Sequence, residues 1–200
     1  MAPFSVFSDL TQRIDAIQKE SFDTVFAFIY VGGQPNFESY VIKGIGKTSI
    51  QNRAIVIGIK DNRAKVISLI DTYKDVFVSK PILTSDTSLR FLRNRASSFR
   101  FERFLPYVWE TYSENDSTVK GFYSNEPGLH EPFQTLYFKD SSESTLREFC
   151  FESLNENYLN SNIFPPNLNF KYNTSLKLFD IYAFLNRLSK MYENQFDFAE

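Results

Sequence analysis

The sequence predicts a mainly β fold, a small barrel of about five strands with helices at both ends of the chain. Segments rich in β-branched and aromatic residues follow one another between residues 22 and 104, separated by turns that contain Gly, Asn or Pro. No long helical pattern alternates with these segments, so a barrel is favoured over a parallel βαβ sheet. Helical spacing of apolar residues occurs before residue 20 and after residue 144.

Residues 1–20 are expected to form an N-terminal capping helix. Leu10, Ile14 and Ile17 fall on one helical face, and the Ser8 side chain can accept a hydrogen bond from the first free N–H groups.

Residues 21–106 are expected to form the barrel. Strands are predicted at residues 22–31, 39–45, 54–59, 76–80, 88–92 and 99–104. The turn Lys60-Asp61-Asn62-Arg63 precedes residues 64–70, whose own pattern fits either the return strand of a hairpin or a short helix.

Residues 107–200 are expected to form an acidic, mixed extension with two helices packed on the barrel. The first helix is predicted at residues 145–159, where Leu146, Phe149, Cys150 and Leu154 have helical spacing. The second begins after Thr174 or Ser175. Its apolar stripe is typical of a helix packed on a core, with a partner surface as the alternative, and contains Leu176, Phe179, Phe184, Leu188 and Met191.

Charge is unevenly distributed along the chain. Residues 21–106 carry 13 Lys+Arg and 7 Asp+Glu, a net of 13 − 7 = +6, whereas residues 107–200 carry 7 and 14, a net of 7 − 14 = −7. Such a split points to a polyanionic partner for the basic part. The alternative is that the two parts neutralise each other across an interface.

Composition argues against most enzyme and metal chemistry. The single cysteine, Cys150, excludes a disulfide framework within the chain and multi-Cys zinc sites, and the single histidine, His130, leaves no histidine pair for a metal. Gly44-Ile45-Gly46-Lys47-Thr48 lacks the spacing of a phosphate-binding loop. We therefore expect no catalytic residues, no metal and no cofactor. The chain has no signal peptide and no run of 18 apolar residues, so we expect a soluble protein in a reducing compartment, without a membrane partner.

Residues 90–104 combine five arginines with four phenylalanines. Single-stranded nucleic acid requires both kinds of side chain, because bases stack on aromatic rings and phosphates bind cations. If residues 99–104 form a strand, Phe99 and Phe101 share one face, and Arg100 lies on the other. The alternative is that the phenylalanines fill the core; for Phe91 and Phe104 the core is favoured, and for Phe99 both alternatives stay open.

Several short motifs occur in an order that a known family shares. They are Phe22-Asp23, Gly46-Lys47-Thr48, Ala54–Asn62, Ser88-Leu89-Arg90-Phe91, Ser97-Ser98-Phe99 and Leu105-Pro106. In this order residues 21–106 resemble the second oligonucleotide-binding (OB) barrel of the protection-of-telomeres proteins, and most closely the short nematode members built around one such barrel. The resemblance implies a five-stranded OB-fold barrel in which Ala64–Asp71 is a helix packed under the barrel.

The resemblance also implies a site for single-stranded telomeric DNA. The family's base-contacting acidic residue falls on Asp61, its late aromatic on Phe99 and a nearby polar contact on Asn94, whereas two family aromatics are replaced by Ser21 and Lys60. Bases would then stack on Phe99 and on Phe37 or Tyr30. The DNA backbone would be held by Lys47, Lys60, Arg63, Lys80, Arg93, Arg95 and Arg100.

The resulting first hypothesis is a nuclear, non-enzymatic protein that binds single-stranded telomeric DNA and acts in telomere-end protection and length regulation. Its C-terminal extension would pack on the barrel or hold other telomere proteins. The second hypothesis is an interaction module of a telomere or replication complex that does not touch DNA. The third is a general binder of single-stranded DNA or RNA.

Overall fold

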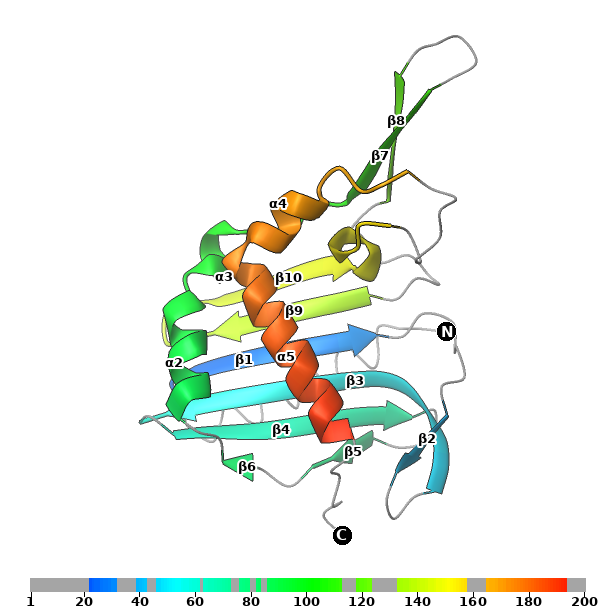
Figure 1. Cartoon of the computed structure of the whole chain (residues 1–200). Helices are drawn as coiled ribbons and strands as arrows, with labels where there is room; N and C mark the ends of the chain where they lie inside the picture. Colours follow the sequence, from blue (N-terminus) through cyan, green and yellow to red (C-terminus); the bar gives the residue numbers. More distant parts are fainter. Residues whose placement is uncertain are drawn as a thin grey trace.

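One antiparallel sheet forms the centre of the computed structural model of the chain (Figure 1). The structure describes residues 22–31, 39–42, 46–61, 63–72, 76–79, 82–83, 86–112, 118–123, 133–157 and 165–193. The predicted N-terminal helix, Phe37, Lys80 and His130 lie outside these residues.

Five long strands make up most of the sheet. They are β1 (Thr24–Val31), β3 (Gly46–Lys60), β4 (Arg63–Thr72), β9 (Phe133–Lys139) and β10 (Ser144–Cys150). Their order is β10-β9-β1-β3-β4, and each neighbouring pair is antiparallel. Strands β1, β3 and β4 form a meander and β9 returns beside β1, which is a Greek-key arrangement.

Three short strands extend the sheet at its margin. Strand β2 (Ser39–Ile42) pairs with β3, and strands β5 (Val76–Val78) and β6 (Ile82–Leu83) pair with β4. The path of paired strands therefore ends at β10 on one side and at β5 on the other. The mainly β character is confirmed, and in the described residues the sheet is open.

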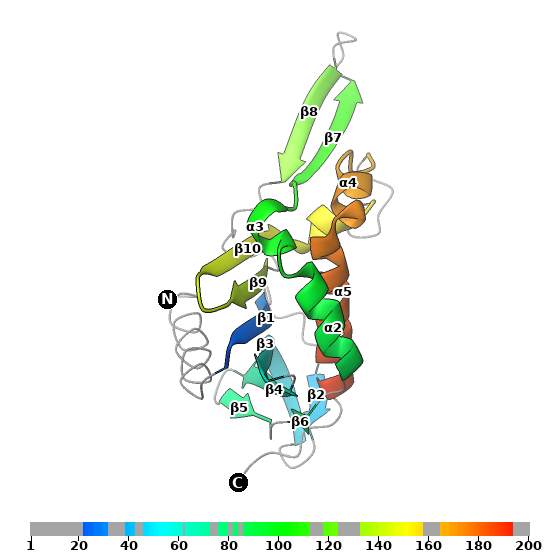
Figure 2. The same ribbon diagram turned by 90° about the vertical axis from the view of Figure 1, so that its left-hand side faces the viewer.

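Helices cover one face of the sheet. Helix α5 (Lys177–Glu193) crosses this face diagonally, with α2 (Asp86–Arg95) and α3 (Ser98–Phe101) beside it (Figures 1 and 2). The 3₁₀ helix η1 (Phe151–Leu154) follows β10, and α4 (Phe170–Ser175) leads into α5.

The core lies between the sheet and these helices. Every second residue of β1, β3 and β9 faces the helices, as the two-residue repeat of a strand requires. These residues are Phe26, Phe28, Ile55, Ile57, Ile59, Leu136 and Phe138, and they pack with Leu92, Leu178, Ile181 and Leu185 of the helices. The opposite face is also buried, at Val25, Ala27, Ile29, Ala54, Val56, Leu69 and Tyr137. Burial of both faces explains why β1 and residues 54–59 of β3 are nearly continuous apolar runs.

A two-stranded arm projects from one end of the molecule (Figures 1 and 2). It consists of β7 (Tyr107–Tyr112) and β8 (Thr118–Tyr123), paired in register from Tyr107↔Tyr123 to Tyr112↔Thr118. Trp109 lies over Gly121, where an added Cβ would come within 2.2 Å of the indole, so Gly121 is required by this close approach.

Two buried asparagines fasten the segment between α3 and the arm. The Asn173 side chain accepts from Leu105 N–H at 2.8 Å and donates to the carbonyls of Leu105 at 2.8 Å and Ser153 at 2.7 Å. The Asn167 side chain accepts from Val108 N–H at 3.3 Å and also donates to the Ser153 carbonyl, at 3.2 Å. These bonds satisfy buried backbone groups that have no partner in the sheet.

Four sequence predictions of secondary structure are wrong. Residues 64–71 form strand β4, not a helix, because they pair with β3 along their whole length after a two-residue turn. Residues 88–92 belong to α2. Of the segment predicted as a strand from 99 to 104, residues 99–101 belong to α3. Neither segment has a sheet partner among the described strands. Residues 144–150 form strand β10, because pairing with β9 outweighs the helical spacing of apolar residues, the first of which, Leu146, is exposed.

The strands predicted at 22–31, 39–45, 54–59 and 76–80 and the final helix are confirmed within one to a few residues, except that β3 begins much earlier than expected. The stripe of the final helix packs on the core at Leu176, Phe179, Phe184 and Leu188, while Met191 is exposed. Strands β9 and β10 join β1 in one sheet, so segments from both sides of residue 106 share one sheet and one core.

Substitution of Asn173 by Leu is expected to lower the free energy of unfolding by about 2–4 kcal/mol, because it leaves Leu105 N–H and two carbonyls without partners in a buried site. Urea unfolding of the full chain measures the change. The control is Thr174→Ala, which removes hydrogen bonds to the Phe170 and Lys171 carbonyls within α4. An Asn173→Leu variant as stable as this control would contradict the role of the bonds.

The free energy of unfolding is expected to fall at alkaline pH because of Tyr182. Its ring packs edge-on against Phe28 and Phe149, and burial raises the pKa of its hydroxyl to about 12. The tyrosine of the unfolded chain ionises near pH 10, so the contribution of Tyr182 to the free energy of unfolding is complete below pH 10. As the pH rises toward 12, about 2–3 kcal/mol of that free energy is lost. Urea unfolding at several pH values should show this loss, and Tyr182→Phe should lack that part of it. Equal pH dependence in both proteins would contradict the prediction.

Candidate nucleic-acid interface

The turn between β3 and β4 carries three of the predicted site residues. Lys60 pairs with Arg63, which leaves two residues in the loop, and Asp61 has a φ of 46°. Two-residue hairpin loops of this kind require positive φ, which Asp tolerates better than most residues. Lys60, Asp61 and Arg63 are all exposed, so the local conformation presents two cations and one carboxylate to solvent.

A further cation lies on the same face of the hairpin. Lys65 is the register partner of Gly58, and its ammonium group lies 5.7 Å from the centre of the Phe22 ring. That ring lies against Gly58, where an added Cβ would come within 2.7 Å of it, so the glycine makes room for Phe22.

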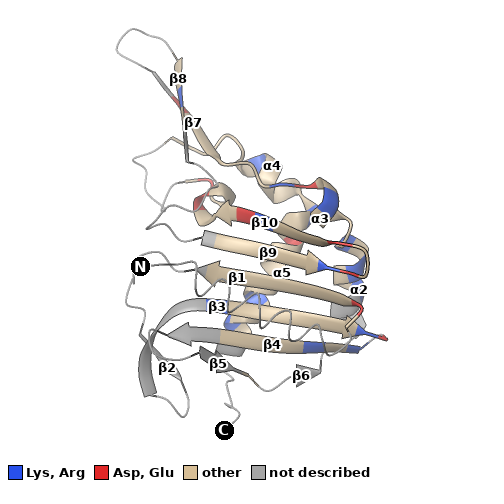
Figure 3. Ribbon diagram, turned by 180° about the vertical axis from the view of Figure 1, so that it is seen from behind, with Lys and Arg blue, Asp and Glu red and all other residues tan. Residues whose placement is uncertain are grey.

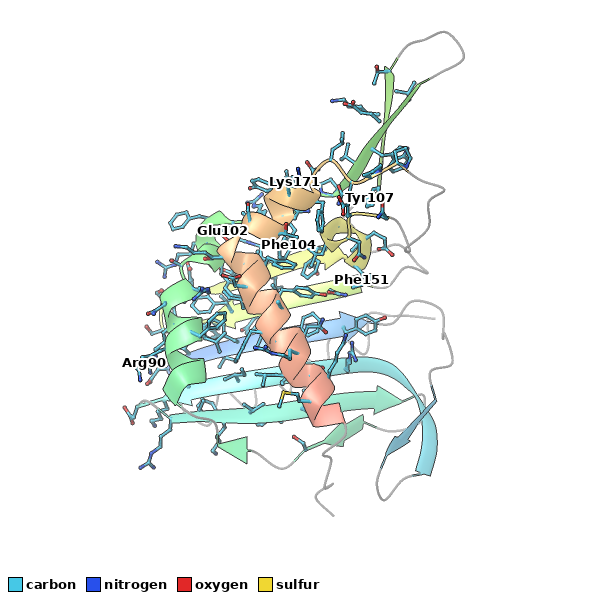
Figure 4. All side chains as sticks on the ribbon, in the orientation of Figure 1. Arg90, Glu102, Phe104, Tyr107, Phe151 and Lys171 are labelled. Carbon is cyan, nitrogen blue, oxygen red and sulfur yellow. The ribbon has the colours of Figure 1, made fainter. Side chains whose placement is uncertain are left out.

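Helix α2 presents a second group of cations. Leu92 is buried in the core and Phe91 packs against Phe184 with ring centres 5.1 Å apart. Arg90, Arg93 and Asn94 therefore form an exposed stripe on the opposite side, and Figure 4 shows Arg90 pointing away from the sheet.

Strand β6 brings the hairpin and α2 together. Leu83 of β6 is the register partner of Lys65, and α2 begins three residues later in the chain. Figures 1 and 3 show the end of the hairpin and α2 at one edge of the molecule, with Lys and Arg concentrated there. We call this surface the basic edge, and it contains Lys60, Arg63, Lys65, Arg90 and Arg93.

The basic edge is strongly cationic. Its five cations lie beside one acidic residue, Asp61, which gives a net of 5 − 1 = +4. Within the described part of the chain, Arg63 and Arg90 form no ion pair. Uncompensated cations of this kind attract a polyanion.

Two predicted phosphate contacts are instead bound to acids of the protein. Arg95 pairs with Asp180 at 2.9 Å, and its guanidinium lies 4.2 Å from the centre of the Phe91 ring. Arg100 pairs with Glu143 and, at 3.4 Å, with Asp140 in the turn between β9 and β10. Hydrogen bonds from Ser142 lower the pKa of the Asp140 carboxyl and keep it charged beside Arg100.

Phe99 does not lie on the surface. It is fully buried, with its ring stacked on Phe138 at 5.2 Å and 5.9 Å from Phe26, so the prediction that bases stack on Phe99 is wrong for this conformation. The prediction assumed a strand, in which Phe99 and Phe101 share a face. In a helix, residues two apart point in nearly opposite directions, so Phe99 enters the core and Phe101 is 83% exposed.

Two charged side chains hold Phe101 in its exposed position. The Arg147 guanidinium donates to the carbonyls of Phe99, Arg100 and Glu102 at the end of α3, and burial lowers its pKa. The Glu102 carboxylate accepts from Leu178 N–H at 2.7 Å, at the start of α5. These contacts fix the path of the chain on either side of Phe101.

The other predicted site residues are separated from the basic edge. The backbone of Lys47 lies near the opposite end of the long strand β3, and its side chain is outside the described set. Tyr30 is half-buried, with the Arg53 guanidinium 4.8 Å from its ring centre. The structure thus brings together Lys60, Asp61, Arg63, Arg93 and Asn94.

Sequence reasoning missed Lys65, Arg90 and Phe101 as surface residues of this region. The helical spacing of Arg90, Arg93 and Asn94 would have revealed the exposed stripe had residues 86–95 been assigned as a helix. Lys65 was missed because the pairing of residues 54–60 with residues 63–70 was not predicted residue by residue.

The fold and this surface define an antiparallel β-sheet protein with helices on one face and a cationic edge. Comparisons with models of known families, with curated proteins and with solved structures find no match to this chain. The described residues bring no three His, Cys, Asp or Glu side chains together as a metal site. Among the described helices, none combines the length and the apolar composition needed to cross a lipid bilayer.

Asp61 is expected to act through its backbone conformation. Asp61→Gly should leave the free energy of unfolding unchanged or higher, whereas Asp61→Ala should lower it by about 1 kcal/mol, because alanine is strained at positive φ. Urea unfolding of both variants measures the difference. An alanine variant as stable as the glycine variant would show that the turn does not depend on this conformation.

Proposed function

We propose that the protein binds single-stranded nucleic acid along the basic edge, without catalysing a reaction. The observation that carries this function is the meeting of exposed cations from the β3–β4 hairpin and from α2 on one edge. Arginine and lysine at these positions would bind phosphates, and their contribution would be strongly salt-dependent.

Phe101 is the proposed stacking residue. Its ring is 83% exposed and follows α2 in the chain by only a few residues. A base stacked on an aromatic side chain contributes about 1–3 kcal/mol. An exposed phenylalanine on the segment that follows α2 is therefore the feature that distinguishes single-strand binding from general attraction to polyanions.

The strand connectivity is compatible with an OB fold that is open between β4 and β10. A Greek-key meander, intervening helices and a returning hairpin occur in the order that such a barrel requires. OB folds bind oligonucleotides on the outer face of their second and third strands. Here Ala54, Val56 and Leu69 on the corresponding face are buried, so we place the ligand at the end of the hairpin.

The telomeric form of this function remains the specific proposal that follows from the family resemblance. It assigns a nuclear role in telomere-end protection and length regulation, with Asp61 and Asn94 as candidate base contacts. Both side chains are exposed at the basic edge and can reach a ligand bound there.

A protein-interaction module is the second candidate. Phe101 and Leu105 are exposed apolar side chains on the segment that leads from α3 to the arm, and such residues are also found in protein interfaces. Phe184, on the apolar stripe of the final helix, does not belong to this candidate surface, because it packs on Phe91 between α2 and α5.

Fluorescence anisotropy with labelled single strands tests the proposed function. Phe101→Ala should weaken binding about 5- to 150-fold, the equivalent of 1–3 kcal/mol. Phe151→Ala, which truncates an exposed phenylalanine on η1, is the matched control and should bind like the wild type. Phe99→Ala is unsuitable because it would empty part of the core.

The same assay separates the cations and the ligands. Arg90→Ala and Arg93→Ala should each weaken the salt dependence of binding by the amount expected for the loss of about one phosphate contact. Arg187→Ala, which removes an exposed arginine from α5, should leave both the affinity and its salt dependence unchanged. A telomeric G-rich strand, its complement, a scrambled strand, RNA and a duplex distinguish specific from general binding. Failure of the folded protein to bind any strand would reject the function and favour the interaction module.

A further inference from the structure

Residues 102–106 connect α3 to the arm and lie against the C-terminal helices. The Glu102 carboxylate accepts from Leu178 N–H at 2.7 Å, at the start of α5. The Asn173 side chain of α4 accepts from Leu105 N–H and donates to the Leu105 carbonyl, both at 2.8 Å. Because the partner position falls from 178 to 173 as the chain advances from 102 to 105, this segment runs antiparallel to α4 and to the start of α5. The exposed side chains of the segment are therefore neighbours of those on α4.

Three exposed cations and one exposed tyrosine belong to these neighbouring segments. We call them the α4 patch, and they are Arg103 of the segment, Lys171 and Tyr172 of α4, and Lys177 at the start of α5. Tyr172 is 47% exposed. Figures 1 and 2 show α2, α3 and α4 following one another toward the arm, and Figure 4 shows Lys171 at the same end of the molecule as Tyr107. Within the described part of the chain, none of the three cations forms an ion pair.

A nucleic-acid strand that stacks on Phe101 can continue in two directions. In one direction lies the turn between β9 and β10, where Asp140 and Glu143 bind Arg100, a net charge of 1 − 2 = −1. In the other direction lies the α4 patch, which together with Glu102 has a net charge of 3 − 1 = +2. Phosphates are repelled by the first surface and attracted by the second, so the α4 patch is the favourable continuation.

We propose that a single strand bound along the basic edge continues past Phe101 onto the α4 patch, where Tyr172 stacks a further base and the three cations bind phosphates. This path rests on the proposed function, to which it adds the direction of the strand and a second stacking residue. The backbone from Phe101 to Leu105, whose bonds to α4 lie next to Tyr172, is at most about 14 Å long. Two rings at this separation can stack different bases of one strand, while Arg103, between Phe101 and Leu105 in the chain, binds an intervening phosphate.

The chemistry of the α4 patch favours nucleic acid over a protein partner. Leu105 and Leu168 are exposed apolar side chains next to the patch, and such side chains also suit a protein interface. Unneutralised cations beside an aromatic ring are the combination that a single strand requires. Stacking needs the flat face of a ring, so Tyr172→Leu removes it and keeps an apolar side chain, whereas Tyr172→Phe retains it.

Fluorescence anisotropy of the full chain with labelled single-stranded DNA of about 4 and about 12 nucleotides tests this path, because only the longer strand can cover the basic edge, Phe101 and the α4 patch together. Tyr172→Leu should weaken binding of the longer strand about 5- to 150-fold and change binding of the shorter strand much less. Tyr172→Phe should bind both strands like the wild type. Leu168→Ala, which truncates an exposed apolar residue next to the patch, is the matched control and should also bind like the wild type.

The salt dependence of the longer strand tests the cations of the patch. Arg103→Ala should lower its slope by the amount expected for about one phosphate contact, and Arg187→Ala is the control that should leave it unchanged.

The outcomes separate this path from the proposed function. If Phe101→Ala weakens binding of the longer strand but Tyr172→Leu and Arg103→Ala do not, the α4 patch is overturned and the proposed function stands. If Leu168→Ala weakens binding as much as Tyr172→Leu, stacking on Tyr172 is overturned in favour of a general apolar contact. Failure of the folded wild type to bind either strand would reject both the path and the proposed function.

Discussion

The pairing of β1 on both of its edges is the constraint on which the structure depends. Strand β1 is bound to β3 on one side and to β9 on the other, and its residues are more than 100 positions away in the chain from their partners in β9. Both of its faces are buried, at Phe26 and Phe28 under the helices and at Val25, Ala27 and Ile29 on the other side. Because β9 must return to β1, α2 and α3 lead the chain from β4, where the cations gather, across the sheet toward β10.

The uneven charge of the sequence has two outcomes in the fold. Some arginines of the basic part are neutralised by the acidic part: Arg95 binds Asp180, and Arg100 binds the turn between β9 and β10. Others, such as Arg63 and Arg90, project from the hairpin and from α2 without an acidic partner in the described residues. Neutralisation between the basic and acidic parts is thus observed at Arg95 and Arg100, whereas Arg63 and Arg90 stay available for the polyanionic partner that we propose.

Buried polar groups connect this edge to the arm. Arg147 and Glu102 fix α3 to β10 and to α5, while Asn167 and Asn173 hold the chain that continues into β7. The chain between α3 and β7 is therefore held to the core by hydrogen bonds along its length.

The sequence by itself determined the β-rich character, the central strands and the final helix, because these have long, strongly periodic apolar patterns. It also determined the turn at Asp61, since residue type decides where positive φ is tolerated. Only the tertiary structure decided the states of residues 64–71, 86–101 and 144–150. In each of these segments the local pattern fits both helix and strand, and the presence or absence of a neighbouring strand is what selects one. The helical state of residues 98–101 also buries Phe99 and exposes Phe101. Side chains two residues apart point to the same side of a strand but to nearly opposite sides of a helix.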